Sequence, residues 1–169
     1  ISHYEERKNM TADHVMVVAY SRKSAYIMYK KFLELRPDYE DVVNMIITPS
    51  NKDSEEMQKA IGTKNDKKEL EIRFKNEADD PNEKFKIAIV VDMWLTGFDV
   101  PSMNTMYIDK PMQGHNLIQA IARVNRVFKN KDSGLIVDYI GIADALRFAL
   151  NIYTKDDQGK IGINVDRAL

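Results

Sequence analysis

Hydrophobic and polar positions alternate in blocks along the chain. Short apolar runs rich in β-branched residues are separated by stretches in which apolar residues recur at helical spacing. This pattern is typical of a parallel sheet covered by helices on both faces. We predict strands at 15–20, 42–48, 85–91, 105–109 and 135–139, with a helix over 24–35 that ends before Pro37. The predicted fold class is therefore α/β, an open and mostly parallel sheet.

The remaining segments predict how this sheet is connected. The charged stretch 53–76 keeps enough apolar residues for one or two amphipathic surface helices, and 77–83 is a polar loop broken by Pro81. Helical spacing returns at 114–128 and 142–150. The polar tail contains Gly159 and Gly162. We expect a linker from a preceding lobe at 1–13, one lobe at 14–153, and a linker or the start of a next domain at 154–169.

Composition narrows the class of protein. A length of 169 residues with 44% hydrophobic residues suits one domain. The absence of cysteine excludes disulfides and thiolate metal sites, which favours a cytoplasmic protein, and no apolar run approaches the roughly 18 to 20 residues that span a bilayer. A net charge of -1 argues against binding nucleic acid by bulk electrostatics, so any DNA contact is expected to be local.

The start of the sequence suggests a larger parent. The first residue is Ile1 rather than methionine, and the opening segment is too polar for a secretory signal. We therefore expect a segment of a longer chain.

Candidate chemistry lies in the residues that follow the strands, because ligands of open α/β sheets bind at the carboxyl ends of the strands. Three segments stand out, at 21–23, 92–101 and 119–126. In the second, Gly97 permits backbone conformations closed to other residues, and Asp99 offers a carboxylate to a ribose hydroxyl or to an arginine. A Gly-x-Asp followed by Pro101 is also a common end to a strand, so both interpretations stay open.

The third segment carries two arginines on one helical face. At about 100° per residue, Gln119, Arg123 and Arg126 fall within an arc of about 60°, opposite the apolar side chains. Two guanidinium groups one turn apart suit a polyphosphate ligand, because each offers a planar fork of donors and a permanent charge. The alternative, which geometry alone favours, is an outer helix face that is simply solvated.

Several stretches, taken together and in order, resemble one family. Residues 87–101 resemble motif V of superfamily 2 helicases, and 119–126 resemble motif VI, with Ala122 and Asn125 where many relatives have glycine. That variant is similar to the one in the restriction (R) subunits of type I restriction enzymes, as are 92–109, 110–115 and 134–141. Residues 15–25 resemble the motif IV region. The resemblance covers about 14–153, and several ordered motifs are more specific than any single one.

The resemblance implies a RecA-like lobe of the phosphate-loop NTPase class. In this family a nucleotide lies between two such lobes, and the first lobe carries a Gly-x-x-x-x-Gly-Lys-Ser/Thr loop. This chain has no such loop, since Gly62-Thr63-Lys64 lacks both the loop and a preceding strand. It therefore resembles the second, C-terminal lobe, and ATP and Mg are expected to be bound mainly by the preceding lobe.

The resemblance also implies roles for the site residues. Arg126 is the expected arginine finger on the γ-phosphate, Arg123 assists it, and Gln119 orients the nucleotide. Gly97 and Asp99 are expected to link the nucleotide to the DNA track.

Expected DNA contacts come from the loops. Ser21, Arg22, Lys23 and Thr96 are the candidates for contacting backbone phosphates of double-stranded DNA. For Arg22 and Lys23, a capped helix start with solvated side chains is an equal alternative. Further partners implied by the resemblance are the preceding lobe and the modification and specificity subunits of a type I site-specific deoxyribonuclease that translocates DNA.

Other patterns are weaker. No metal site is expected, because the three histidines are scattered, at positions 3, 14 and 115. A nuclease pattern from Asp38 to Asp66 is disfavoured, because Asp66 lies in a helix-like stretch. Aromatic side chains able to stack on a base, but more often found in a core, are Trp94, Phe98 and Tyr107.

Two competing hypotheses need no motor. The first is a self-contained doubly wound domain that binds a small ligand or a protein. The second is a degenerate lobe kept only as scaffold.

Overall fold

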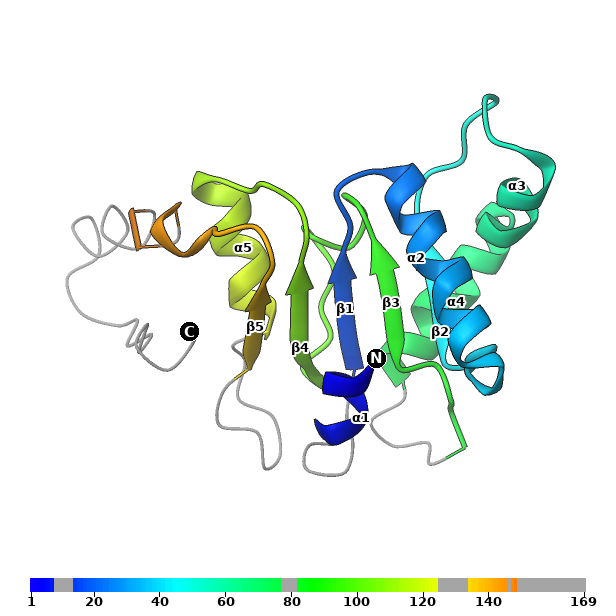
Figure 1. Ribbon diagram of the computed structural model, residues 1–169, viewed down its shortest axis with the longest axis horizontal. Helices are drawn as coiled ribbons and strands as arrows, with labels where there is room; N and C mark the ends of the chain where they lie inside the picture. Colours follow the sequence, from blue (N-terminus) through cyan, green and yellow to red (C-terminus); the bar gives the residue numbers. More distant parts are fainter. Residues whose placement is uncertain (8–13, 77–81, 125–133, 146, 149–169) are drawn as a thin grey trace.

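The computed structural model describes residues 1–7, 14–76, 82–124, 134–145 and 147–148 (Figure 1). Five strands form one sheet in the order β2-β3-β1-β4-β5, and every recorded pairing is parallel. The strands are β1 (His14–Val18), β2 (Val43–Ile46), β3 (Ile87–Val90), β4 (Met103–Ile108) and β5 (Leu135–Asp138). All five predicted strands are present, and the α/β fold class is confirmed.

Helices cover both faces of this sheet. The helices are α2 (Arg22–Leu35), α3 (Glu55–Ile61), α4 (Lys64–Asn76) and α5 (Gly114–Val124). Apolar side chains of α4 and α5 pack on one face, and those of α2 and α3 pack on the other. The charged stretch therefore forms two helices, but they are less superficial than predicted, because Ile61 and Phe74 are fully buried. Residues 125–128 of the predicted helix 114–128 lie outside the described residues.

Helix α2, predicted at 24–35, begins at Arg22 and so earlier than predicted. Ser21 is its N-cap: the Ser21 hydroxyl accepts from the Ser24 amide at 3.2 Å, and the Ser24 hydroxyl accepts from the Ser21 amide at 2.7 Å. This reciprocal capping box satisfies two amides at the helix start. Strand β1 ends at Val18 rather than at the predicted Tyr20. Helical spacing alone did not include residues 21–23 because they are polar, but the alternative given for Arg22 and Lys23, a capped helix start, agrees with this N-cap.

Part of the predicted linker at 1–13 is a helix packed on the domain. Helix α1 (Ser2–Arg7) lies across the lower part of the sheet in Figure 1. The Tyr107 hydroxyl lies 2.7 Å from His3 Nδ1, and Glu5 forms an ion pair with Arg36, which leads into the short 3-10 helix η1 (Pro37–Tyr39). In the predicted helix 142–150, residues 143–145 and 147–148 are helical, and the tail 154–169 lies outside the described residues. No helix in the described part of the chain has the length and apolar character to cross a membrane.

A histidine is buried at the start of the central strand. His14 is fully buried, its Nδ1 lies 2.7 Å from the Ser102 hydroxyl, and its ring packs 4.2 Å from the Phe74 ring centroid. Burial, reinforced by the positive charge of Lys86, lowers the pKa of His14 from its ordinary 6.5 to about 3. The folded protein therefore holds this side chain neutral at every physiological pH.

This depressed pKa predicts an acid-sensitive stability. Below pH 6.5 the unfolded chain binds a proton at His14 that the folded chain refuses until about pH 3. The free energy of unfolding should therefore fall by about 1.4 kcal/mol per pH unit as the pH decreases below the unfolded pKa. Urea unfolding between pH 6.5 and 5 would measure it.

The His14→Gln variant serves as the control, since glutamine does not titrate. The Arg73 ion pair lowers the pKa of Glu83 to about 2 from an ordinary 4.5, so that carboxylate loses its contribution only at lower pH. An equally steep decline in the glutamine variant would show that His14 is not the cause.

Candidate nucleotide and DNA site

All five strands end at one edge of the sheet, the upper edge in Figure 1, because the pairing is parallel throughout. The loops that follow the strands therefore lie along this edge, where ligands of open α/β sheets bind. The segments at 21–23 and 92–101, which the sequence singled out, follow β1 and β3.

The loop after β3 is a constrained turn rather than a simple strand end. Trp94 has a φ of 66° and Gly97 a φ of 71°, both in the left-handed region. For Trp94 this conformation costs about 1–2 kcal/mol, which burial of the indole offsets. Its ring is stacked on Phe98 with centroids 4.0 Å apart. Trp94, Phe98 and Tyr107 are all buried, so the core interpretation of these aromatics is confirmed.

Arg123 of α5 holds this loop by its backbone. The Arg123 Nε donates to the Leu95 carbonyl at 2.9 Å, and the same guanidinium donates to the Phe98 carbonyl. The structure thus brings together the two segments in which the sequence placed nucleotide chemistry. Arg123 is therefore not simply solvated, and it anchors the loop on either side of Gly97.

The other residues of these two segments are less fully placed. Gln119 Nε2 lies 2.5 Å from His115 Nε2, one turn earlier on α5. Gly97 and Asp99 are exposed on the loop. Arg126 lies outside the described residues. The nucleotide roles of these four residues stay predictions.

A lysine that sequence reasoning missed closes the other end of the loop. Lys110, two residues after β4, forms an ion pair with Asp92, two residues after β3, and its ammonium lies 3.4 Å from the Val91 carbonyl. Because β1 lies between β3 and β4, this side chain spans the end of the central strand. Both residues directly follow predicted strands, so the strand ends signalled them, but the strand order was needed to pair them.

An open pocket of about 630 Å³ lies beside this ion pair. Its lining residues are Asp92, Leu95, Thr96, Lys110, Pro111, Met112, Gln113 and Asn116. Hydroxyl, amide and ammonium groups in this lining are donors suited to phosphate or sugar oxygens. Within the described ranges, no three His, Cys, Asp or Glu residues gather as a metal site would require.

The four candidates for DNA contact differ in whether their side chains already have partners within the domain. The side chain of Ser21 caps α2, and Arg22 donates to the Thr48 carbonyl at 2.8 Å and pairs with Asp53. Lys23 and Thr96 are exposed on the same edge of the sheet. Ser21 and Arg22 therefore have structural partners, whereas Lys23 and Thr96 present their side chains to solvent.

The nuclease pattern finds no support among the described residues. Asp66 accepts from the Thr63 amide at 2.7 Å and so caps the start of α4, and Asp38 forms an ion pair with Arg36. Both carboxylates serve local structure.

Comparison with protein families identifies the chain. The family described as Type I restriction enzyme subunit R domain 3 matches residues 3–141. The chain belongs to this family. The type I restriction enzyme HindI endonuclease subunit of Haemophilus influenzae is 47% identical over 163 residues, which cover 91% of this chain. The R-subunit domain spans only 15% of the length of that relative.

Solved structures agree on the fold. An ATP-dependent Type ISP restriction-modification enzyme, LlaBIII, bound to DNA, matches 76% of this chain and 8% of its own with a TM-score of 0.51 and 20% identity. The C-terminal domain of the DEAD-box protein Dbp5 matches 92% of this chain and 76% of its own with a TM-score of 0.54 and 15% identity. These neighbours support the predicted RecA-like class, and at this identity they show the fold alone.

Loss of the Arg123 anchor should loosen the 92–99 loop. In an Arg123→Lys variant the charge is kept, but a single ammonium cannot reproduce the fork to two carbonyls. Because hydrogen bonds from charged groups contribute about 1.5–3 kcal/mol, amide exchange in this loop should accelerate by about tenfold or more. Hydrogen exchange read by mass spectrometry would measure it.

Arg147→Lys is the matched control, because Arg147 is exposed and pairs only loosely, at 3.5 Å, with Asp144. Unchanged exchange over 92–99 in the Arg123 variant would show that the arginine does not anchor the loop.

Proposed function

We propose that this domain is the second motor lobe of the ATP-dependent DNA translocase in a type I restriction enzyme R subunit. The observation that carries the proposal is the contact between Arg123 of α5 and the carbonyls of Leu95 and Phe98. Through it, helix α5 with Arg123 and the loop with Gly97 and Asp99 are joined at the ligand-binding edge of the sheet.

In this proposal ATP binds between this edge and the preceding lobe of the same polypeptide, which supplies the phosphate loop and most contacts to Mg. Arg126 is the arginine finger that stabilises charge on the γ-phosphoryl group as it transfers. Arg123 supports the finger by holding the loop, and Gln119 orients the nucleotide. The Asp99 carboxylate accepts a hydrogen bond from a ribose hydroxyl.

The same edge is proposed to contact the DNA backbone. Thr96 and Lys23 are exposed donors on it, and contacts to phosphates carry no sequence information, which suits a motor that moves along any sequence. Recognition of a particular site then belongs to the specificity subunit, and double-stranded DNA and the modification subunit are the further partners.

Replacing the finger should abolish the motor. In the full R subunit, Arg126→Ala should reduce ATP hydrolysis by about a thousandfold or more, because an arginine finger contributes about 10³ to 10⁵ in rate. Translocation should be lost with it, while the circular dichroism spectrum stays that of the parent. Arg147→Ala is the control, and translocation at the parent rate in the Arg126 variant would refute the finger assignment.

The isolated 169-residue chain should not turn over ATP, because it contains no phosphate loop. A phosphate-release assay on the purified chain tests this, and appreciable turnover would contradict the two-lobe proposal. Calorimetry on the same sample separates it from a self-contained ligand-binding domain: tight binding of a nucleotide without the preceding lobe would favour that alternative.

A further inference from the structure

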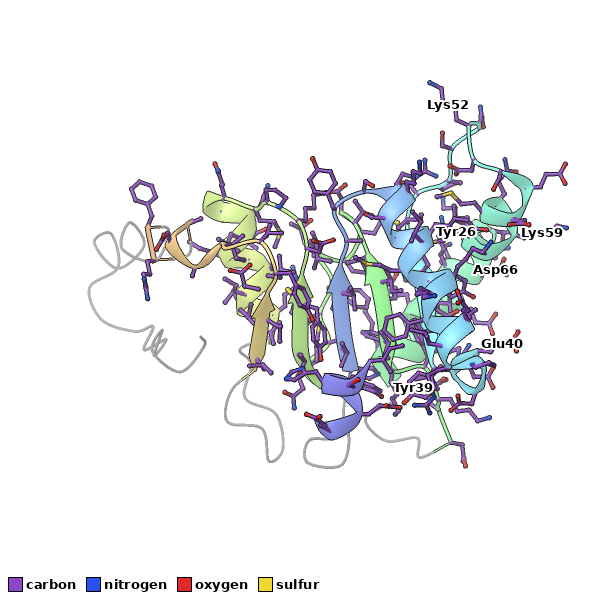
Figure 2. The ribbon with its side chains drawn as sticks, in the orientation of Figure 1. Tyr26, Tyr39, Glu40, Lys52, Lys59 and Asp66 are labelled. Carbon is purple, nitrogen blue, oxygen red and sulfur yellow. The ribbon has the colours of Figure 1, made fainter. Side chains whose placement is uncertain are left out.

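The loop between β2 and α3 rises from the carboxyl edge of the sheet. Figure 1 shows it extending beyond the other loops of this edge, and Figure 2 shows Lys52 at its tip, directed away from the rest of the molecule. Asn51 and Lys52 are exposed, and none of the sequence motifs covers this loop. The loop therefore places an exposed cation, Lys52, beyond the ligand-binding edge of the sheet.

One hydrogen bond and one ion pair hold the base of this loop to α2, and a further hydrogen bond lies within the loop. Arg22 Nε donates to the Thr48 carbonyl at 2.8 Å, and the Arg22 guanidinium pairs with Asp53, whose side chain is only 6% exposed. Asp53 also accepts from the Ser50 amide at 2.7 Å. Burial disfavours its charge, but the bonds from Arg22 and Ser50 outweigh burial and lower the pKa of Asp53, so the pair stays ionised.

A second cation, Lys67 of α4, also binds the backbone at the base of this loop. Lys67 Nζ donates to the Ile47 carbonyl at 2.6 Å, one residue before the carbonyl that Arg22 binds. Burial, and then the nearby charge of Arg22, lower the pKa of Lys67. Arg22 and Lys67 are thus committed to the end of β2, whereas Lys52, at the tip of the loop, is exposed. Its ammonium has no ion-pair partner within the described parts of the chain.

We propose that the 49–54 loop contacts the phosphate backbone of duplex DNA through Lys52, and that Arg22 and Asp53 are positioning residues that hold the loop. This inference rests on the proposed motor function. Lysine and asparagine side chains are typical donors to phosphates, and a domain with a net charge of -1 must place such cations locally. Arg22, predicted from the sequence as a DNA contact, then acts through the loop.

Salt dependence of DNA binding tests the contact. With the full R subunit in its assembled complex and a duplex that lacks the recognition sequence, log affinity is measured against log salt concentration. Each lost phosphate contact lowers the magnitude of the slope by about 0.9. Lys52→Ala should show this loss. Lys84→Ala is the matched control, because Lys84 is an exposed lysine just before β3, at the opposite edge of the sheet, and its slope should not change.

Asp53→Asn distinguishes positioning from direct contact. If Arg22 holds the loop through Asp53, the magnitude of the salt slope should fall in this variant by as much as in Lys52→Ala, although the variant removes a negative charge. If Arg22 itself contacts DNA, freeing it from Asp53 leaves the slope equal or steeper, which would overturn the positioning role.

An unchanged slope in the Lys52 variant overturns the DNA contact, as does a Lys52 effect on complex assembly in the absence of DNA, which would indicate a protein contact. The Arg126 variant reports separately on the motor. Normal ATP turnover in the Arg126 variant would contradict the proposed function. If instead the Arg126 variant is inactive and the Lys52 variant has an unchanged salt slope, only this inference is contradicted.

Discussion

Parallel pairing of the five strands is the constraint on which the rest of this structure depends. Because every strand runs in the same direction, all carboxyl ends meet at one edge, and residues separated by many positions in the sequence come together there. The central strand β1 lies between β3 and β4, so the loops after those two strands flank its end. The contacts of Arg123 with the loop after β3, and of Lys110 with Asp92, join segments along this edge that are far apart in the sequence.

The loop after β3 shows how the edge is built. Two residues with positive φ, Trp94 and Gly97, turn the backbone. The stacked and buried rings of Trp94 and Phe98 pack the loop against the core. Arg123 from α5 and Lys110 from the end of β4 then bind its backbone and its first carboxylate. A loop fixed from three sides presents its exposed atoms in one arrangement, and such preorganisation is what a nucleotide or phosphate site requires.

Charges on the same edge divide into two kinds. Arg22, Lys67 and Lys110 bind carbonyls or carboxylates of the domain itself, and so they stabilise loops. Lys23 and Lys52 are exposed. Lys23 and Lys52 can therefore present local positive charge to a polyanion although the whole chain has a net charge of -1.

The amino-acid sequence alone determined the strands, the order of helices and strands, and the segments that carry candidate chemistry, because apolar periodicity and local motifs are encoded by neighbouring residues. It also indicated the helix that carries Arg123, and it contains no phosphate loop. Only the tertiary structure decided that Arg22 pairs with Asp53, 31 residues away, and that Lys110 reaches Asp92. Those partners depend on which strands are adjacent and on how far each loop extends, and no local pattern records either property.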